Sequence, residues 1–561
     1  MTENMSQTVF LVVDEDASAV DTLVSDLERR FAADYRVLGE SSPQAALDRL
    51  SALRDAGDQV ALIICYEPMQ AMPGSELLAH SRSTHPDAKR ILLVDYGDLR
   101  MLDVIAQGMA VGNVEHYLTK PWRPRQHLLY PVVGEALVAW TRRHSPGFQL
   151  IRIVGDRWHP TSYELRDGLG RNNVPYGFYD RDSPEGAELL QQLDEVPDHP
   201  VIFLADGRIL TDYTEADIAE AVGAQVHPKR QAYDLVVVGA GPAGLSAAVY
   251  GASEGLSTLV LESVAMGGQA GTSSRIRNFL GFPAGISGDE LAERAFQQAW
   301  MFGAEFVFIN GAAGLSAQAD ELAVTLADGE QVTARAVVLA TGVTYRQLDT
   351  PGVAGLIGAG VFYGSAMSEA PALKDQDVFI VGAGNSAGQA AVYLARSARS
   401  VTLLVRGDAL ARSMSEYLIT EIDSTPRVRV RLHTEVGAAR GEHRLSELVL
   451  RDRRTGREEA VPAAALFVMI GATPHTGWLP DSIARDRHEF VLTGGDVPGF
   501  GSPGDTGPVP LPLETSLPGV FAAGDVRAGS VKRVASAVGE GSVAIPQVHQ
   551  HLQRQTTRAA G

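Results

Sequence analysis

Cysteine is almost absent from this sequence. The 561 residues contain one cysteine, Cys65, so two cysteines of this chain cannot form a disulfide or a redox-active dithiol. Cys65 ends the apolar run 61–65. A small buried core residue is the expected role for a cysteine in such a run, and a reactive thiol is the alternative.

The chain is also poor in basic residues and in long apolar runs. It has 48 Lys and Arg against 68 Asp and Glu, for a net charge of −20, whereas a non-specific nucleic-acid binder needs clustered basic residues. No apolar segment approaches the length of a bilayer span, and no basic region precedes the first apolar stretch. We therefore expect no nucleic-acid partner, no membrane span and a cytoplasmic location. The length allows roughly four domains of about 150 residues each.

The stretch 233–262 carries the first signal for a ligand. An apolar run is followed by Gly239, Gly241 and Gly244, and a second apolar run ends at Glu262. This pattern predicts a strand, a tight turn, a helix and a strand, in which the glycines let a pyrophosphate approach the helix N-terminus. Glu262 is then placed to bind a ribose hydroxyl. The pattern indicates a dinucleotide site, and a glycine turn in an ordinary parallel sheet is the alternative.

The same arrangement recurs over 377–406. Gly382, Gly384 and Gly388 follow an apolar run, and the next run leads to Arg406. Two such loops imply two dinucleotides. An arginine where the first loop has a glutamate can pair with a 2′-phosphate, which favours NADP(H) over NAD(H). A solvated surface arginine is the alternative.

The N-terminal part alternates short apolar runs with helical patterns, which predicts a doubly wound α/β domain. Residues 1–128 resemble a response-regulator receiver domain, which implies a flavodoxin-like fold. Asp14 and Glu15 match the acidic pair that holds Mg²⁺ in that family, and Lys120 matches the lysine before its proline. Asp14 and Glu15 are therefore candidate Mg²⁺ ligands.

Two positions depart from the receiver pattern. Tyr66 stands where that family has its phosphorylated aspartate, and Val94 stands where it has a switch Thr or Ser. A phenol is a poor acceptor for acyl-phosphate chemistry. Glu67 is adjacent to Tyr66, but neighbouring strand residues point to opposite faces. We predict a pseudo-receiver that pairs subunits or docks a partner.

A helical linker is predicted over 129–147, and a smaller α/β unit follows over 148–226. This unit resembles the thioredoxin and glutaredoxin fold, with Pro200 at the place of that family's cis-proline. The family's Cys-x-x-Cys corresponds here to His159–Ser162, which excludes thiol–disulfide exchange at this module. A binding or spacing role is left, and a thiol substrate could still use the cis-proline shelf.

From Tyr233 to residue 561 the sequence resembles the two-domain flavoprotein reductases, most closely the low-molecular-weight thioredoxin reductases. Besides the two glycine loops, the supporting motifs are MGGQA at 266–270, RIRNFLGFPAGISG at 275–288, VLATG at 338–342 and GVFAAGDV at 519–526. The resemblance implies two Rossmann-like domains. An FAD-binding domain is expected in two parts, 231–347 and 477–561, with an NAD(P)H-binding domain over 348–476 between them.

The resemblance also assigns cofactor contacts to individual residues. Those expected for FAD are Gly239, Gly241, Pro242, Ala243, Gly244, Glu262, Gly268, Gln269, Asn278, Thr341, Gly342, Gly524, Asp525, Arg533, Val534 and Ala535. Those expected for NAD(P)H are Gly382, Gly384, Asn385, Ser386, Ala387 and Arg406. Asp525 can accept from the ribityl chain, and Gln269 and Asn278 offer amides to the isoalloxazine edge. Arg533 begins the segment over the flavin pyrimidine, where Val534 replaces the usual glutamine.

The redox dithiol of those reductases is missing from its expected place. Gly364, Ser365, Ala366 and Met367 stand at the Cys-x-x-Cys positions, and none of these side chains can reversibly take two electrons from a flavin. Met367 is expected to pack rather than react. His475 is the histidine best placed for proton handling, and a structural role in its loop is the alternative.

These features predict an α/β multidomain enzyme that resembles fused response-regulator and thioredoxin reductase-like proteins. We expect an FAD-dependent NAD(P)H oxidoreductase that passes electrons to a small-molecule or protein acceptor outside this chain. One alternative is a thioredoxin-disulfide reductase that acts on an external disulfide directly from the flavin. Another is a flavin-bound redox sensor or signalling scaffold. The resemblance also implies a homodimer.

Overall fold

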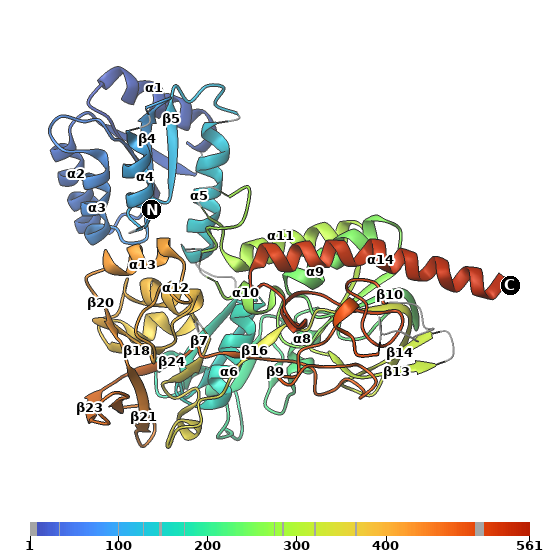
Figure 1. Ribbon diagram of the computed structural model, residues 1–561. Helices are drawn as coiled ribbons and strands as arrows, with labels where there is room; N and C mark the ends of the chain where they lie inside the picture. Colours follow the sequence, from blue (N-terminus) through green and yellow to red (C-terminus); the bar gives the residue numbers. More distant parts are fainter. Residues whose placement is uncertain are drawn as a thin grey trace. The chain divides into compact units, whose positions relative to one another are not determined.

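The chain divides into two compact units, residues 1–148 and 149–561 (Figure 1). The computed structural model describes residues 8–560 except 33, 99, 111, 127, 145–148, 173, 274, 283–284, 319–320, 365–366 and 500–509. Among the helices described in these ranges, none is long and apolar enough to cross a bilayer.

The first unit is a parallel sheet flanked by helices. Its elements are β1 (Thr8–Val13), α1 (Ala17–Phe31), β2 (Tyr35–Glu40), α2 (Pro43–Ala56), β3 (Val60–Tyr66), α3 (Gly74–Thr84), β4 (Lys89–Asp95), α4 (Met101–Ala110), β5 (His116–Lys120) and α5 (Leu129–His144). The five strands are in the order β2-β1-β3-β4-β5, and every neighbouring pair is parallel. This is a doubly wound order, which places the carboxyl ends of all five strands at one edge.

Helix α5 belongs to the core of this unit. It covers the segment for which a helical linker is predicted, yet Leu129, Val133 and Trp140 pack in one cluster with Phe10 of β1 and Leu62 of β3. Their repeat at helical spacing gives α5 an apolar face, which the sheet buries. The segment is therefore the fifth helix of the unit as well as the connection to the next one.

The second unit begins with a small mixed sheet. Its elements are β6 (Ile151–Gly155), α6 (Pro160–Arg171), β7 (Tyr176–Asp180), α7 (Pro184–Leu190), β8 (Val201–Leu204), β9 (Ile209–Leu210) and α8 (Glu215–Ala221). The strand order is β7-β6-β8-β9, with β6 and β7 parallel and the other pairs antiparallel. We call residues 149–226 the small α/β module.

Cis peptide bonds in the described part of the chain precede Pro121 and Pro124 and not Pro200. The prediction of a cis-proline at 200 is therefore wrong. No disulfide chemistry takes place at His159–Ser162 that would require the cis isomer, and the trans bond has the lower energy. The shelf predicted for a thiol substrate loses its basis as well.

The next part is built on a seven-stranded sheet. Its elements are β10 (Ala232–Val238), α9 (Pro242–Ser253), β11 (Thr258–Glu262), α10 (Gly268–Gly271), α11 (Gly288–Met301), β12 (Glu305–Phe308), β13 (Ala312–Gln318), β14 (Glu321–Leu326), β15 (Gln331–Leu339), β26 (Val520–Ala522), η4 (Gly524–Val526) and α14 (Val534–Ala560). The strand order is β12-β11-β10-β15-β14-β13, and β26 pairs with β15 in parallel. Strand β26 comes from the far end of the chain, so this part is discontinuous in sequence.

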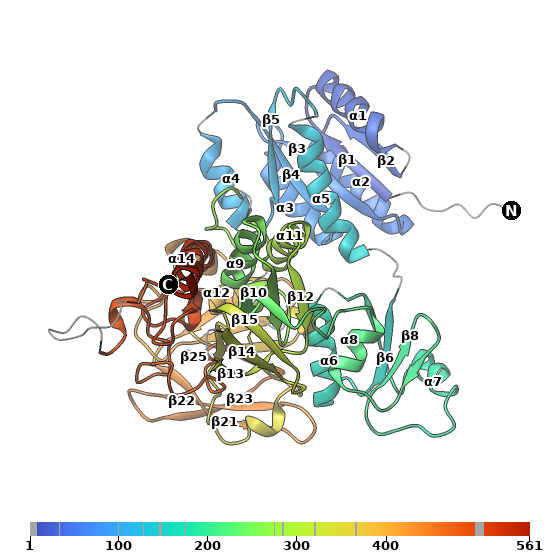
Figure 2. The same ribbon diagram turned by 90° about the vertical axis from the view of Figure 1, so that its right-hand side faces the viewer.

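Helices α9, α11 and α14 lie together beside this sheet (Figures 1 and 2). Val237 of β10 packs in one cluster with Ala248 of α9 and Ile545 of α14. Its neighbour Val236 packs on the opposite face with Val324 of β14. Alternate residues of β10 thus face two cores, as the strand period requires. The region is the base from which the first glycine loop projects.

We call the part built on the seven-stranded sheet the first nucleotide-type domain. A second nucleotide-type domain is inserted in the sequence between its strands β15 and β26. Its elements are η1 (Ala354–Leu356), β17 (Val361–Tyr363), η2 (Met367–Leu373), β18 (Asp377–Val381), α12 (Asn385–Leu394), β19 (Ser400–Leu404), α13 (Glu416–Asp423), β20 (Val428–Arg431), β21 (Thr434–Arg440), β22 (Glu447–Asp452), β23 (Glu458–Pro462) and β24 (Ala465–Val468). The parallel sheet has the order β17-β24-β18-β19-β20, and β21-β22-β23 form a separate antiparallel sheet. The chain enters and leaves through β16 (Val343–Tyr345) and β25 (Ala472–Pro474), which pair antiparallel.

Candidate functional site

The first glycine loop joins β10 to α9. Gly239 has a φ of 105°, and a Cβ there would lie 2.5 Å from the carbonyl oxygen of Ala340. A Cβ on Gly244 would lie 1.8 Å from the carbonyl oxygen of Gly239. In contrast, a Cβ on Gly241, the N-cap of α9, would meet nothing within 4 Å. Gly239 and Gly244 are therefore required by backbone packing. Gly241 leaves open space at a helix N-terminus, where a phosphate can bind.

Glu262 lies beside this loop at the end of β11. The N–H of Ala240 donates to its Oε2 at 2.7 Å, and the N–H groups of Val264 and Ala265 donate to its Oε1 at 2.8 and 3.1 Å. These bonds fix the buried carboxylate next to the start of α9. The contact of Glu262 with a ribose stays a prediction.

The Gly524–Asp525 motif meets the same helix start. Ala243 is the second residue of α9, directly after Pro242. A Cβ on Gly524 would lie 2.8 Å from the Cβ of Ala243. The carboxyl group of Asp525 is half-buried, and its burial raises its pKa. The loop, the first turn of α9 and the acidic motif thus come together from segments almost 300 residues apart in the sequence, at the carboxyl ends of parallel strands, where dinucleotides bind in folds of this kind.

The other residues predicted to contact FAD lie around this centre. A Cβ on Gly268 would lie 3.3 Å from the Cα of Gly241. Thr341 and Gly342 follow β15, and the Thr341 hydroxyl donates to the carbonyl oxygen of His475 at 3.1 Å. The His475 side chain is exposed. The remaining residues of this group are exposed or half-buried: Gln269, Asn278, Arg533, Val534 and Ala535.

The second glycine loop repeats the geometry of the first. Gly382 has a φ of 156°, and a Cβ there would lie 2.7 Å from the carbonyl oxygen of Met469. A Cβ on Gly384, the N-cap of α12, would meet nothing within 4 Å. The side chain of Asn385 accepts from the Ser415 N–H at 2.8 Å and donates to the Ser415 hydroxyl at 3.1 Å. The start of α12 is therefore anchored and open to a phosphate.

The other predicted NAD(P)H contacts differ in exposure. Ala387 is buried in the first turn of α12, and the Ser386 hydroxyl bonds to Tyr345. Arg406 is exposed just beyond β19. Arg453 approaches it, because its Nη1 donates to the Arg406 carbonyl oxygen at 3.5 Å. Sequence reasoning missed this second basic side chain, since 47 residues separate the two arginines.

The position of the missing dithiol lies close to the second loop. Gly364 has a φ of 81°, and a Cβ there would lie 3.2 Å from the ring of Tyr345, which also contacts the start of α12. Ser365 and Ala366 lie outside the described residues, as does the side chain of Met367. The replacement of a redox pair at these four positions therefore rests on the sequence.

A buried ion pair just after this position was not predicted. Arg166 of α6 binds Glu369 of η2, with Nη1 and Oε1 2.7 Å apart and side chains only 3% and 0% exposed. Arg166 also donates to the carbonyl oxygens of Ser162 and Arg157, at 3.1 and 3.0 Å. The pair joins the small α/β module to the inserted domain across 203 residues.

The beginning of α6 packs on the inserted domain around this pair. The rings of Tyr163 and Phe362 are 5.2 Å apart, and the guanidinium of Arg444 lies 5.7 Å from the Trp158 ring. On its other side, Asn172 donates to the carbonyl oxygen of Val264 at 3.0 Å. The module therefore contacts both nucleotide-type domains, and the helix start at His159–Ser162 is part of an internal interface.

Lys120 and Tyr66 contact the acidic residues at the carboxyl edge of the sheet in the first unit. Lys120 pairs with Asp14 and lies 3.4 Å from the centre of the Tyr66 ring. The Tyr66 hydroxyl donates to Asp95 at 2.8 Å. Burial, aided by the bond to Asp95, raises the pKa of Tyr66 to about 12, so the phenol keeps its proton at physiological pH. Cys65, next to it, is fully buried, and this burial raises the pKa of its thiol, as expected for a core residue.

Two other carboxylates of the first unit have partners on the loop before α3 and in the first turn of α3. Glu15 accepts from the Ala71 N–H at 3.1 Å, and backbone hydrogen bonds from Gln70 and Ala71 lower the pKa of Glu15. Glu67 accepts from the N–H and the hydroxyl of Ser75, at 2.6 and 3.0 Å. The binding of Mg²⁺ by Asp14 and Glu15 stays a prediction.

Comparison with known proteins finds a match over the part of the chain that contains the two glycine loops. The family model described as pyridine nucleotide-disulphide oxidoreductase matches residues 233–541. The chain belongs to this family. This match confirms the prediction of an FAD-dependent pyridine nucleotide oxidoreductase. It also confirms the predicted cofactors, FAD and NADPH.

The relatives of this oxidoreductase cover the same part of the chain. It is similar to thioredoxin reductase from Treponema pallidum, with 34% identity over 56% of this chain and 94% of the relative. It is also similar to that from Bacillus subtilis, with 31% identity over 57% and 95%. The crystal structure of T. acidophilum thioredoxin reductase matches with a TM-score of 0.52 and 27% identity, over 57% of this chain and 99% of that one. The oxidoreductase therefore has a thioredoxin reductase-like part over about 57% of its length.

Proposed function

We propose that this protein oxidises NAD(P)H through FAD and delivers the electrons to an acceptor outside the chain, without an internal dithiol. The observation that carries this proposal is the cysteine content. The chain has one cysteine, and Cys65 is buried in β3 of the first unit. A reversible two-electron thiol relay needs two sulfur atoms that can meet.

The residues at the two loops fit the two cofactors. Open space beside Gly241 and beside Gly384 lies at the N-terminus of a helix in each domain, and helix N-terminal N–H groups stabilise phosphate. Asp525 follows Gly524, which packs on the first turn of α9, and its carboxyl can accept from a polyol. When bound, FAD supplies the hydride-accepting chemistry, and the chain's residues hold and orient it.

We propose that the small α/β module is a thioredoxin-like domain that acts as a structural attachment. Its strand order β7-β6-β8-β9 supports the fold. Its helix start has no cysteine and is covered by contacts of Trp158, Tyr163 and Arg166 with the inserted domain. A module fixed in this way can hold the inserted domain or shield the segment around Gly364.

An acceptor assay tests the proposed function. With NADPH in excess, we expect the purified protein to turn over with oxygen or a quinone and to leave thioredoxin disulfide unreduced, because no dithiol connects the flavin to a protein disulfide. The mass of the thioredoxin, after alkylation of its free thiols, reports its reduction directly. Stoichiometric reduction of thioredoxin would instead establish the alternative, a disulfide reductase that works directly from the flavin.

A flavin-bound redox sensor or scaffold is the second candidate function. The Lys120–Asp14 pair with the Tyr66 ring beside it and the covered helix start of the small module favour it, since both modules lack the residues of their catalytic relatives. The open second nucleotide loop favours the enzyme. The homodimer and the cytoplasmic location stay predictions.

We propose that the first unit is a receiver-like domain that does not accept phosphate. Its strand order supports the fold, and Tyr66 with its raised pKa stands at the acceptor position. Incubation with acetyl phosphate and Mg²⁺ is expected to leave the intact mass of the protein unchanged. A stoichiometric increase of one phosphoryl group on the first unit would contradict the proposal.

A further inference from the structure

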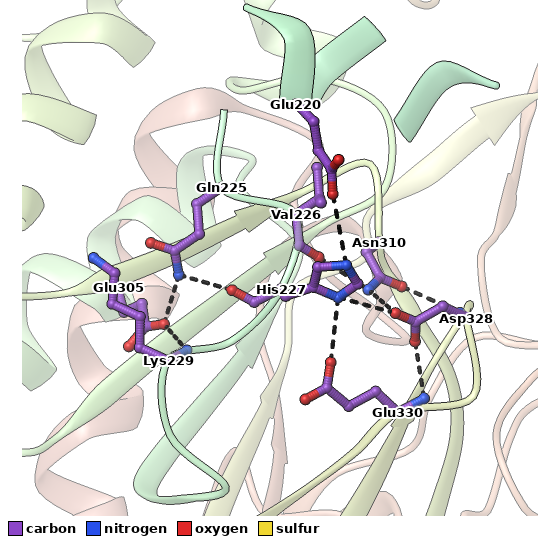
Figure 3. Close-up of polar contacts among 9 residues, drawn as sticks. All are labelled: Glu220, Gln225, Val226, His227, Lys229, Glu305, Asn310, Asp328 and Glu330. Atoms are coloured by element: carbon purple, nitrogen blue, oxygen red, sulfur yellow. Dashed lines mark hydrogen bonds and ion pairs between the residues drawn. The ribbon is translucent and has the colours of Figure 1, made fainter. Parts of the chain in front are cut away.

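A cluster of possible metal ligands lies where the chain passes from the small module to β10 (Figure 3). His227 Nδ1 is 3.3 Å from Asp328 Oδ2 and 3.3 Å from Glu330 Oε2. Asp328 and Glu330 lie on the turn between β14 and β15. One nitrogen and two carboxylate oxygens from two separate segments thus converge, within 4.8 Å of one another.

The two segments are held in place by other bonds. Glu305 Oε1 accepts from the side chain of Gln225 at 2.6 Å and from the N–H of Lys229 at 2.5 Å, which fixes the chain on both sides of His227. Buried Asn310 donates to Asp328 Oδ2 at 2.8 Å and to the carbonyl oxygen of Val226 at 3.0 Å. The three ligand groups are therefore positioned by a supporting layer, as the close-up shows (Figure 3), and metal sites require this kind of support.

The spacing suits a tetrahedral ion. Ligands about 2.0–2.1 Å from Zn²⁺ lie about 3.3–3.4 Å from one another in a tetrahedron, and both distances from His227 Nδ1 are 3.3 Å. The two carboxylates have oxygens within 4.8 Å of each other, where their charges repel, and a dication neutralises them. On the far side of the ring, Glu220 Oε1 is 3.7 Å from Nε2. This carboxylate lies on the side of the ring opposite the ligand nitrogen, which is where metal-binding histidines have their supporting partner.

We propose that His227, Asp328 and Glu330 bind one Zn²⁺ ion, with a fourth position open to water. The ion ties the segment after the small module to the β14–β15 turn and so restrains the module against the first nucleotide-type domain. The exposed fractions of 60%, 35% and 37% for the three side chains give Zn²⁺ direct access from solvent. This site is separate from the two glycine loops, and its test does not depend on the acceptor.

Calorimetric titration of the chelator-treated full-length protein with Zn²⁺ tests the site. We expect one equivalent to bind, and we expect His227→Ala and Asp328→Asn each to weaken that binding by at least about 10-fold, the lower end of the loss seen when even a supporting residue of a metal site is removed. His443→Ala, which alters an exposed histidine elsewhere, should bind like the parent. Flavin content verifies that each variant is folded.

A second measurement separates a metal site from a simple ion-pair cluster. Zn²⁺ is expected to raise the melting temperature of the parent and of His443→Ala, and not that of His227→Ala. The proposal is overturned if the parent binds no Zn²⁺, or if His227→Ala and Asp328→Asn bind it as tightly as the parent. In that outcome His227 serves only as an ion-pair partner of the surrounding carboxylates.

Discussion

Replacing Glu369 by alanine is expected to destabilise the second unit by about 3–5 kcal/mol, the loss typical of a buried ion pair from which one partner is removed. The variant leaves Arg166 with a charge that is 3% exposed and has lost its carboxylate partner. Two backbone carbonyl groups still accept from it, but they carry no compensating charge. Denaturant unfolding followed by intrinsic fluorescence measures the change.

Two further variants define the origin of this effect. Asp408→Ala removes an ion pair with Arg412 whose side chains are 51% and 73% exposed, and it should cost less than about 1 kcal/mol. The double variant Arg166→Met/Glu369→Leu removes both charges and should recover most of the loss, because a hydrophobic replacement leaves no unpaired buried charge. A loss below about 1 kcal/mol in Glu369→Ala would show that the small module is not docked at this position, since an exposed pair contributes no more than that.

Replacing Arg406 by alanine is expected to raise the KM for NADPH by about 10- to 100-fold and to leave the KM for NADH within about 2-fold. A hydrogen bond to a charged group contributes about 1.5–3 kcal/mol, and only NADPH carries the 2′-phosphate that Arg406 can bind. The Arg453 guanidinium reaches the backbone carbonyl of Arg406 but is paired with Glu435, so Arg453→Ala should show a smaller loss of the same kind. Steady-state kinetics with both nucleotides measures the split.

The outcome of this comparison decides the role of Arg406. Arg399→Ala serves as the control, because Arg399 is an exposed arginine paired with Asp377 at the start of β18, the opposite end of that strand from the glycine loop, and it should leave both KM values unchanged. Equal loss with NADPH and NADH would show that Arg406 supports the domain without recognising the 2′-phosphate. No loss with either nucleotide would make it a solvated surface residue.

The nucleotide loops could be predicted because their chemistry is local. Gly244 is required by a close approach within the loop, and Gly241 and Gly384 leave open space at helix starts. These requirements act over a few residues, so they leave a pattern in the sequence, whereas the contact that requires Gly239 is with Ala340, just after β15. The alternation of apolar runs and helical segments likewise predicted the doubly wound sheet of the first unit, since burial on both faces of parallel strands produces continuous apolar runs.

The contacts between modules could not be predicted because they join distant residues. Arg166 and Glu369 are ordinary charged residues in the sequence, and only their burial on opposite sides of an interface makes them important. The same holds for Lys120, which the resemblance identified but whose contact with the Tyr66 ring depends on the fold. Pro200 was wrongly predicted to be cis because a family feature was transferred to a module that lacks the cysteines it accompanies.

The most direct test of the account is an anaerobic titration of the flavin-loaded protein with NADPH, following the long-wavelength flavin absorbance. With no dithiol in the chain, one equivalent of NADPH carries all the electrons the protein can store, and we expect bleaching to be complete at one equivalent per flavin. An endpoint near two equivalents would reveal a second electron store and contradict the account. A flavin that NADPH fails to bleach would also contradict it and would favour a sensor or scaffold.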